Sequence, residues 1–296
     1  MTPRHTILAI TVVVIWGLNF VVIDAGLGEG SDRVPPLVFL ALRFVLVVFP
    51  AILFIKPPPI GWKNVLLIGT FLSLGQFSLL YLALALGMPA GLASLLLQTQ
   101  VVSAILLRER PTSRQSFGIS VGMVGLTVVI VGHSTTAPWL PLVVTLLAAL
   151  SWAIGNVLAR RAGSASGLSL TVWSGVVVPI PALALSMLVD SPAVVIDSIV
   201  GITPIAIVST LFTAVAASLI GYGIWNSLLA RYPTSAVVPF TLLVPVVGII
   251  TAWLVQNEQP TLTELLGGAV MLAGLAVAVI QRRQVQTPLP TVPPPG

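Results

Sequence analysis

The sequence predicts an all-α membrane protein with ten transmembrane helices, arranged as two inverted five-helix repeats around a central cavity. Three observations lead to this prediction: the composition, a series of long apolar stretches, and an internal repeat at about half the chain length. Of the 296 residues, 57% are hydrophobic and only 7% are charged, whereas a soluble domain usually carries about 25% charged residues. The composition therefore excludes a soluble globular domain.

Ten apolar stretches follow one another along the chain. A helix of about 20 apolar residues crosses a hydrocarbon layer of about 30 Å, and a helix satisfies its backbone hydrogen bonds without water. The predicted spans are Thr6–Ala25, Pro36–Ile55, Lys63–Leu86, Ala90–Leu107, Gln115–Val131, Trp139–Ala159, Leu168–Val189, Thr203–Ala230, Ser235–Val255 and Thr261–Ile280.

The charges between these spans predict the orientation. With ten spans, the basic residues collect in alternate loops and at both termini, and among the loops of the other side only Arg33 is basic. Because basic loops stay in the cytoplasm, both termini are expected there. The basic residues on this side are Arg4, Lys56, Lys63, Arg108, Arg110, Arg114, Arg160, Arg161, Arg231, Arg282 and Arg283.

Two motifs occur once in each half of the chain. The sequence Glu109-Arg110-Pro111-Thr112 returns after 149 positions as Glu258-Gln259-Pro260-Thr261, and the spacing from Tyr81 to Pro89 returns after 144 positions from Trp225 to Pro233. A fixed period of this kind indicates two copies of one unit, and five spans per copy make the second copy inverted. The predicted parts are a first repeat over residues 1–133, a second over 134–283 and a disordered proline-rich tail over 284–296.

The two offsets differ by five residues, so the fourth span is predicted to be shorter than the ninth. Either the span is truly short, or residues are missing from the sequence. Missing residues would produce a Cα–Cα step above 3.8 Å near Val102–Ile105.

Polar and aromatic side chains within the spans are the candidate substrate-binding residues. Amides can both donate and accept hydrogen bonds, and aromatic rings can wall an apolar part of a solute. The alternative is that these amides bond one helix to another. The candidates are Trp16, Asn19, Arg43, Gln76, Tyr81, Gln98, Trp152, Asn156, Trp173, Tyr222, Trp225 and Asn226. Ser218, Tyr222 and Asn226 are expected to form one stripe at i, i+4 and i+8.

Arg43 is the one basic residue well inside a span. A charge in the hydrocarbon layer is costly and therefore suggests a function. A structural pair with Asp24, or a side chain that reaches toward the headgroups, would explain Arg43 equally well.

Several kinds of chemistry have no motif in this sequence. There is no Gly-Lys-Ser/Thr phosphate loop, no carboxylate in the middle of a span, and no cysteine. We therefore expect no cofactor, no metal site and no catalytic residues, and the protein is predicted not to be an enzyme.

The sequence resembles the EamA-type exporters of the drug/metabolite transporter superfamily over both halves. The resemblance lies in Val14-Ile15-Trp16-Gly17-Leu18-Asn19-Phe20, Leu42-Arg43-Phe44, Gly87 to Leu95, Gly221 to Trp225 and Leu243 to Gly248. It implies ten spans in two inverted repeats around a substrate cavity. The members it resembles most are bacterial exporters of aromatic amino acids and of cysteine and O-acetylserine, although substrates differ among relatives.

The predicted function is a secondary transporter that exports amino acids or related small metabolites across the bacterial inner membrane by alternating access. Its expected partners are a small-molecule substrate and the lipid bilayer, with no nucleic acid, and it would act as a monomer or homodimer. Three alternatives stay open: a multidrug exporter of hydrophobic compounds, a carrier of phosphorylated sugars, which would need more buried cations than Arg43, and a non-transporting membrane scaffold.

Overall fold

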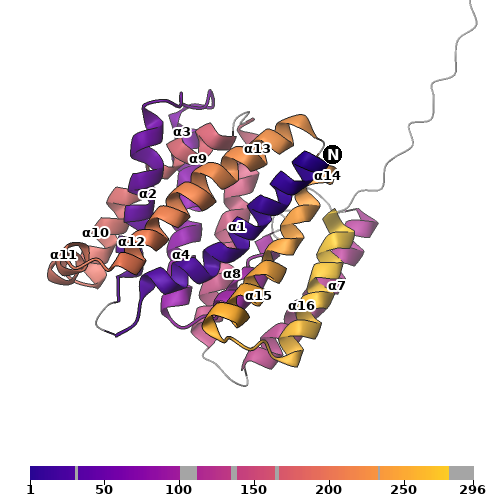
Figure 1. The fold of residues 1–296 in the computed structure, drawn as a ribbon. Coiled ribbons are helices and arrows are strands. Elements are labelled where there is room, and N and C mark those ends of the chain that lie inside the picture. The colour runs from indigo at the N-terminus through magenta and orange to yellow at the C-terminus, as the bar shows by residue number, and fades with distance from the viewer. Residues whose placement is uncertain (31–32, 101–111, 135–138, 164–166, 233, 280–296) are drawn as a thin grey trace, which may run out of the picture.

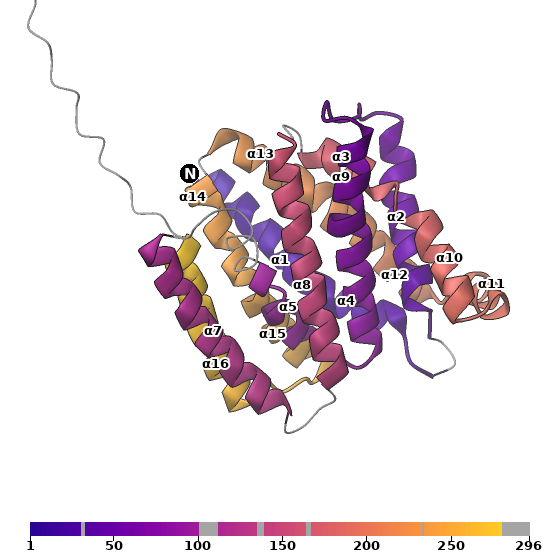
Figure 2. The same ribbon diagram turned by 180° about the vertical axis from the view of Figure 1, so that it is seen from behind.

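The computed structural model describes residues 1–30, 33–100, 112–134, 139–163, 167–232 and 234–279, and every regular element in these ranges is a helix (Figures 1 and 2). The first half contains α1 (Pro3–Leu27), α2 (Pro36–Ile52), α3 (Trp62–Ile68), η2 (Gly69–Gly75), α4 (Gln76–Ala85), α5 (Ala90–Leu96) and α7 (Ser113–Ser134). The second half contains α8 (Trp139–Arg161), α9 (Gly167–Gly175), α10 (Pro179–Val189), α11 (Pro192–Val200), α12 (Pro204–Leu211), η3 (Phe212–Gly221), α13 (Tyr222–Arg231), α14 (Thr234–Val237), η4 (Val238–Leu243), α15 (Val244–Gln256) and α16 (Leu262–Val279).

The helices have the lengths and composition of a multi-pass membrane protein. Within the described residues, seven helical stretches are long and apolar enough to cross a membrane, and two shorter apolar helices cover Pro36–Ile52 and Leu262–Ala278. The all-α membrane class is thereby confirmed. The predicted fourth span begins with α5, which ends at Leu96. Residues 101–107 of that span, and with them its expected shortening, lie outside the described residues, as does the predicted tail over 284–296.

Two spans differ from the prediction of simple helices. The seventh is interrupted at residues 176–178, and α10 begins at Pro179 in the first helical position, where a proline needs no backbone donor. The ninth begins with the short α14 and the 3₁₀ segment η4 before α15 starts at Val244. In addition, α11 is a helix that the span pattern did not predict, because nine residues are too few to cross the bilayer.

The third and eighth spans each contain a π-helical segment. The segments η2 and η3 replace regular α-helix in the middle of the two spans. An offset of 144 positions moves residues 69–75 of η2 onto residues 213–219, which lie within η3. A π segment shifts the register of all later side chains on its helix, so it redirects the side chains that follow it in each span.

The helices α7 and α16 pack against each other at one edge of the bundle, away from α2, α10 and α11 (Figures 1 and 2). They are antiparallel, since Gly118 faces Gly274 and Gly125 faces Gly267: an added Cβ at Gly118 would lie 2.6 Å from the Gly274 carbonyl oxygen, and one at Gly125 would lie 2.5 Å from that of Gly267. Under the 149-residue offset, Gly118 corresponds to Gly267 and Gly125 to Gly274, so the two contacts are equivalent. The two helices therefore approach each other closely at these glycines.

The two ends of the bundle differ in charge. At the end where α1 starts, at the top of Figure 1, His5 bonds to the Tyr232 hydroxyl (2.7 Å) and to Arg231 (3.3 Å). At the opposite end, Gln256 bonds to Asp24 (2.6 Å). We call these the basic end and the acidic end.

Candidate functional site

The buried guanidinium of Arg43 is the centre of the polar interior. Arg43 lies in α2 with an exposed fraction of only 1%. Its Nε and Nη2 donate to the Ser218 hydroxyl at 3.3 and 2.9 Å, and its Nη1 donates to the Tyr81 hydroxyl at 3.2 Å. Its Cζ also lies 4.2 Å from the ring centre of Phe77. The three contacting residues belong to α4 and η3, so elements of both halves surround the charge.

Of the alternatives for Arg43, the structural pair with Asp24 is contradicted by the structure. The Asp24 carboxylate accepts a hydrogen bond from Gln256 instead, at the acidic end. Arg43 is in contact with hydroxyls and an aromatic face, and it pairs with no carboxylate among the described residues. A guanidinium has five N–H donors, and the three bonds to Ser218 and Tyr81 use three of them. Two donors and a full positive charge are therefore left for another acceptor.

An aromatic group lies next to Arg43. The ring of Trp16, from α1, is 5.1 Å from that of Tyr222 and 5.2 Å from that of Trp225. The indole Nε1 of Trp16 donates to the carbonyl oxygen of Ala217 at 3.0 Å. Because Ala217 precedes the Ser218 that contacts Arg43, the aromatic group and the guanidinium adjoin on one segment of η3.

Three predicted amides carry buried atoms that have no hydrogen-bond partner among the described residues. These atoms are Asn19 Oδ1, Gln76 Oε1 and Asn226 Nδ2. Asn19 and Gln76 are 7% and 3% exposed, and the Asn226 amide packs against Gly167 at the start of α9. An unsatisfied buried polar atom costs about 1–3 kcal/mol. Such a cost is common at positions that receive a polar ligand, which then supplies the missing partner.

Four other predicted residues do not join these groups by any described contact. Asn156 in α8 donates to Gln100 Oε1 at 3.2 Å, as the alternative of helix-to-helix bonding expects. Trp173 donates to the Ile55 carbonyl oxygen at 2.8 Å and stacks edge-on with Trp62, so it fastens α9 to the segment after α2. Trp152 is half-buried against the core, and Gln98 is buried in the turn after α5.

Ser218 and Phe77 are contacts of Arg43 that the list of candidates lacked. The expected stripe of Ser218, Tyr222 and Asn226 does not follow a regular α-helix, because Ser218 lies in η3 and donates to the Thr213 carbonyl oxygen five residues earlier (2.8 Å). Phe77 has no polar side-chain atom, so its sequence position alone did not suggest a binding residue. Its nearness to the guanidinium depends on how α2 and α4 pack.

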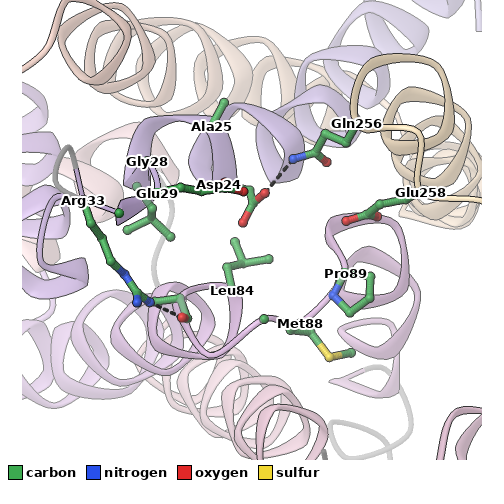
Figure 3. A pocket seen from close by; sticks show the side chains of 14 residues that line it. Asp24, Ala25, Gly28, Glu29, Arg33, Leu84, Met88, Pro89, Gln256 and Glu258 are labelled. Carbon is green, nitrogen blue, oxygen red and sulfur yellow. Dashed lines mark hydrogen bonds between the residues drawn. The ribbon is translucent and has the colours of Figure 1, made fainter. Parts of the chain in front are cut away.

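A cavity of about 540 Å³ opens at the acidic end (Figure 3). None of the predicted substrate-binding residues lines it. Its polar lining comes from Asp24, Glu29, Arg33, Gln256 and Glu258, with the turn from Gly87 to Pro89 on one side. Six of the twelve predicted residues are instead buried inside the helix bundle: Asn19, Arg43, Gln76, Tyr81, Gln98 and Trp225.

Comparison with known proteins agrees with this architecture. Residues 4–131 and 139–280 each match the model of the EamA-like transporter family. The chain is 40% identical over 294 residues to a probable amino-acid metabolite efflux pump of Escherichia coli, covering 96% of this chain and 97% of that protein. It is 39% identical to the Salmonella typhimurium protein of the same description, covering 97% and 98%. It is also 29% identical to a probable terminal-alkyne amino-acid exporter of Streptantibioticus cattleyicolor, over 68% and 69% of the two chains.

A solved crystal structure has the same fold, with a TM-score of 0.63 at 19% sequence identity over 96% of this chain and all of that chain. Both family matches together span nearly all of the described residues. The chain belongs to the EamA-like transporter family.

Proposed function

We propose that this protein is a secondary transporter that exports amino acids or related small metabolites across the bacterial inner membrane. The descriptions of the Escherichia coli and Salmonella relatives support this substrate class. The observation that carries the proposal is the buried Arg43 guanidinium, which has two free donors and no carboxylate partner among the described residues. A charge in this position is costly unless something pairs with it, and a substrate carboxylate is a planar acceptor that fits the guanidinium fork.

The neighbouring groups suit the rest of an amino acid. Within the part of the chain that the structure describes, the oxygen atoms Asn19 Oδ1 and Gln76 Oε1 receive no hydrogen bond. An ammonium group has three donors and no acceptor, so it could supply these bonds. The rings of Trp16, Tyr222 and Trp225 can enclose an apolar side chain. A positive charge at Arg43 disfavours lipophilic cations, which is why the multidrug alternative ranks second.

Alternating access is proposed from the repeated features of the two halves. The two family matches, the two π segments and the exchanged glycine contacts of α7 and α16 support two copies in opposite orientation, over residues 1–133 and 134–283. Opposite copies allow one half to rock against the other around a site between them. The basic end would face the cytoplasm, with both termini there.

Counterflow in proteoliposomes with a panel of labelled amino acids tests this function. We expect at least one amino acid to exchange, and we expect Tyr222→Ala and Asn226→Ala to lower its initial rate about tenfold or more, since each removes a wall or a donor of the site. Ser227→Ala is the matched control on the same helix, because Ser227 is exposed and bonds only within its own turn. Exchange of lipophilic cations without any amino acid would favour the multidrug alternative, and unchanged rates would remove both residues from the site.

A further inference from the structure

At the acidic end, one carboxylate connects the two halves of the chain. Glu258 follows α15, and its two oxygens accept hydrogen bonds from the backbone N–H groups of Ala90 (3.0 Å) and Gly91 (3.2 Å) at the start of α5. The first N–H groups of a helix have no partner within the helix, and a negative charge there is favourable. Figure 3 shows Glu258 beside Pro89 on the wall of the cavity.

A third hydrogen bond crosses between the halves at the same place. Gln256, in the last turn of α15, donates to Asp24 near the end of α1 at 2.6 Å. Both Gln256 and Glu258 belong to the second half, whereas Asp24 and α5 belong to the first. These three hydrogen bonds therefore hold the end of α15 to two different helices of the other half, across the cavity that Figure 3 shows.

Next to these bonds, α5 and α15 are in tight contact through small residues. A Cβ added to Gly91 would lie 3.1 Å from Ile249 Cα and 3.3 Å from Ala252 Cβ. Ala252 is only 1% exposed. The contact of α5 with α15 is therefore close, and Gln256 and Glu258, which line the cavity, lie beside it.

We propose that Glu258 and the Asp24–Gln256 bond form a latch. The latch keeps the contact of α5 with α15, which we call the seam between the two halves, closed at the acidic end. The carboxylate suits a reversible closure. The bonds are charge-assisted and so favour the closed arrangement, while the adjoining cavity of about 540 Å³ lets water replace them when the helices separate. The role of the latch in export rests on the proposed function, but the closure itself does not.

The absence of cysteine from the chain makes the latch directly testable. An Ala252→Cys variant carries a single thiol in the seam beside the latch, and its reaction with a hydrophilic maleimide reports the opening of the seam. The protein is held in lipid nanodiscs, where the reagent reaches both ends, so neither orientation nor transport affects the reading. Ile249→Cys, which reduces side-chain volume, serves as a second reporter of the same contact.

In this background we expect Glu258→Ala to increase the labelling rate about tenfold, because two charge-assisted bonds that favour the closed seam are lost. Gln256→Ala should give a smaller increase, and Glu258→Gln an intermediate one, since an amide oxygen can still accept one bond. Glu29→Ala is the matched control: it removes an exposed carboxylate from the same cavity wall and should leave the rate unchanged.

A purely structural helix cap would give a different pattern. Glu258→Ala would then have a lower thermal stability, but its folded form would be labelled at the same rate as Glu29→Ala. That result would overturn the proposed latch. If Glu258→Ala does not survive purification, Glu258→Gln decides by the same comparison. Labelling that responds to Glu258 in a protein that exchanges no amino acid would keep the latch and refute only the proposed function.

Discussion

An Arg43→Gln variant is expected to exchange amino acids about a hundredfold more slowly than the unmodified protein. Removing one partner of a buried, hydrogen-bonded charge pair costs about 3 kcal/mol, which corresponds to a factor of about a hundred. The fold should tolerate the change, because a glutamine amide can bond to the Ser218 and Tyr81 hydroxyls that Arg43 now contacts. Arg43→Lys keeps the charge but loses the planar fork, so it should recover only part of the rate.

The measurement is the initial rate of counterflow at equal amounts of reconstituted protein, with the thermal midpoint in detergent recorded beside it. Arg33→Gln is the matched control, since Arg33 lines the cavity at the acidic end and donates to the Ala85 carbonyl oxygen. A full rate in Arg43→Gln would show that the guanidinium is structural and that the substrate carboxylate, if bound, is bound elsewhere.

A Gly125→Ala variant is expected to lose about 1–3 kcal/mol of stability through overpacking. The added methyl group would lie 2.5 Å from the Gly267 carbonyl oxygen and 2.8 Å from Met271 Cα. Both are backbone atoms of α16, so no side chain can rotate away and the two helices must separate. Gly274→Ala should have the same effect, because its Cβ would lie 2.6 Å from the Gly118 carbonyl oxygen.

Gly122→Ala is the control on the same helix. A Cβ at Gly122 would have its nearest contact at 3.7 Å, from the Met271 carbonyl oxygen, which is an ordinary van der Waals distance, and alanine also has the higher helix propensity. Thermal unfolding in detergent should show a lower midpoint for Gly125→Ala and an equal or higher midpoint for Gly122→Ala. Equal midpoints for the unmodified protein, Gly125→Ala and Gly122→Ala would contradict the tight packing of α7 on α16.

The sequence predicted features that depend on local pattern. The apolar stretches identified the helices because length and hydropathy alone decide whether a segment can cross a membrane. The helix α11 was missed because the spans were identified by their length. A nine-residue segment that starts at Pro192 is too short to count as a span.

The partners of buried groups could not be predicted in the same way. The proximity of Asp24 and Arg43 in the expected spans suggested a pair, yet Arg43 contacts Ser218 from a segment 175 positions away. The π segments keep the composition of an ordinary span while they change its register, so the expected stripe through Ser218, Tyr222 and Asn226 was wrong in geometry although each residue is in the interior. Contacts of this kind depend on tertiary packing, which a single sequence does not specify.

The central claim is that the buried guanidinium of Arg43 binds the carboxylate of an exported amino acid. It is tested most directly by competition in counterflow, for whichever amino acid exchanges fastest, with its methyl ester and with its decarboxylated amine as competitors. The unlabelled amino acid should compete fully, and both analogues should compete at least about tenfold more weakly because they offer Arg43 no carboxylate. Equal competition by the amine or the ester would contradict the claim.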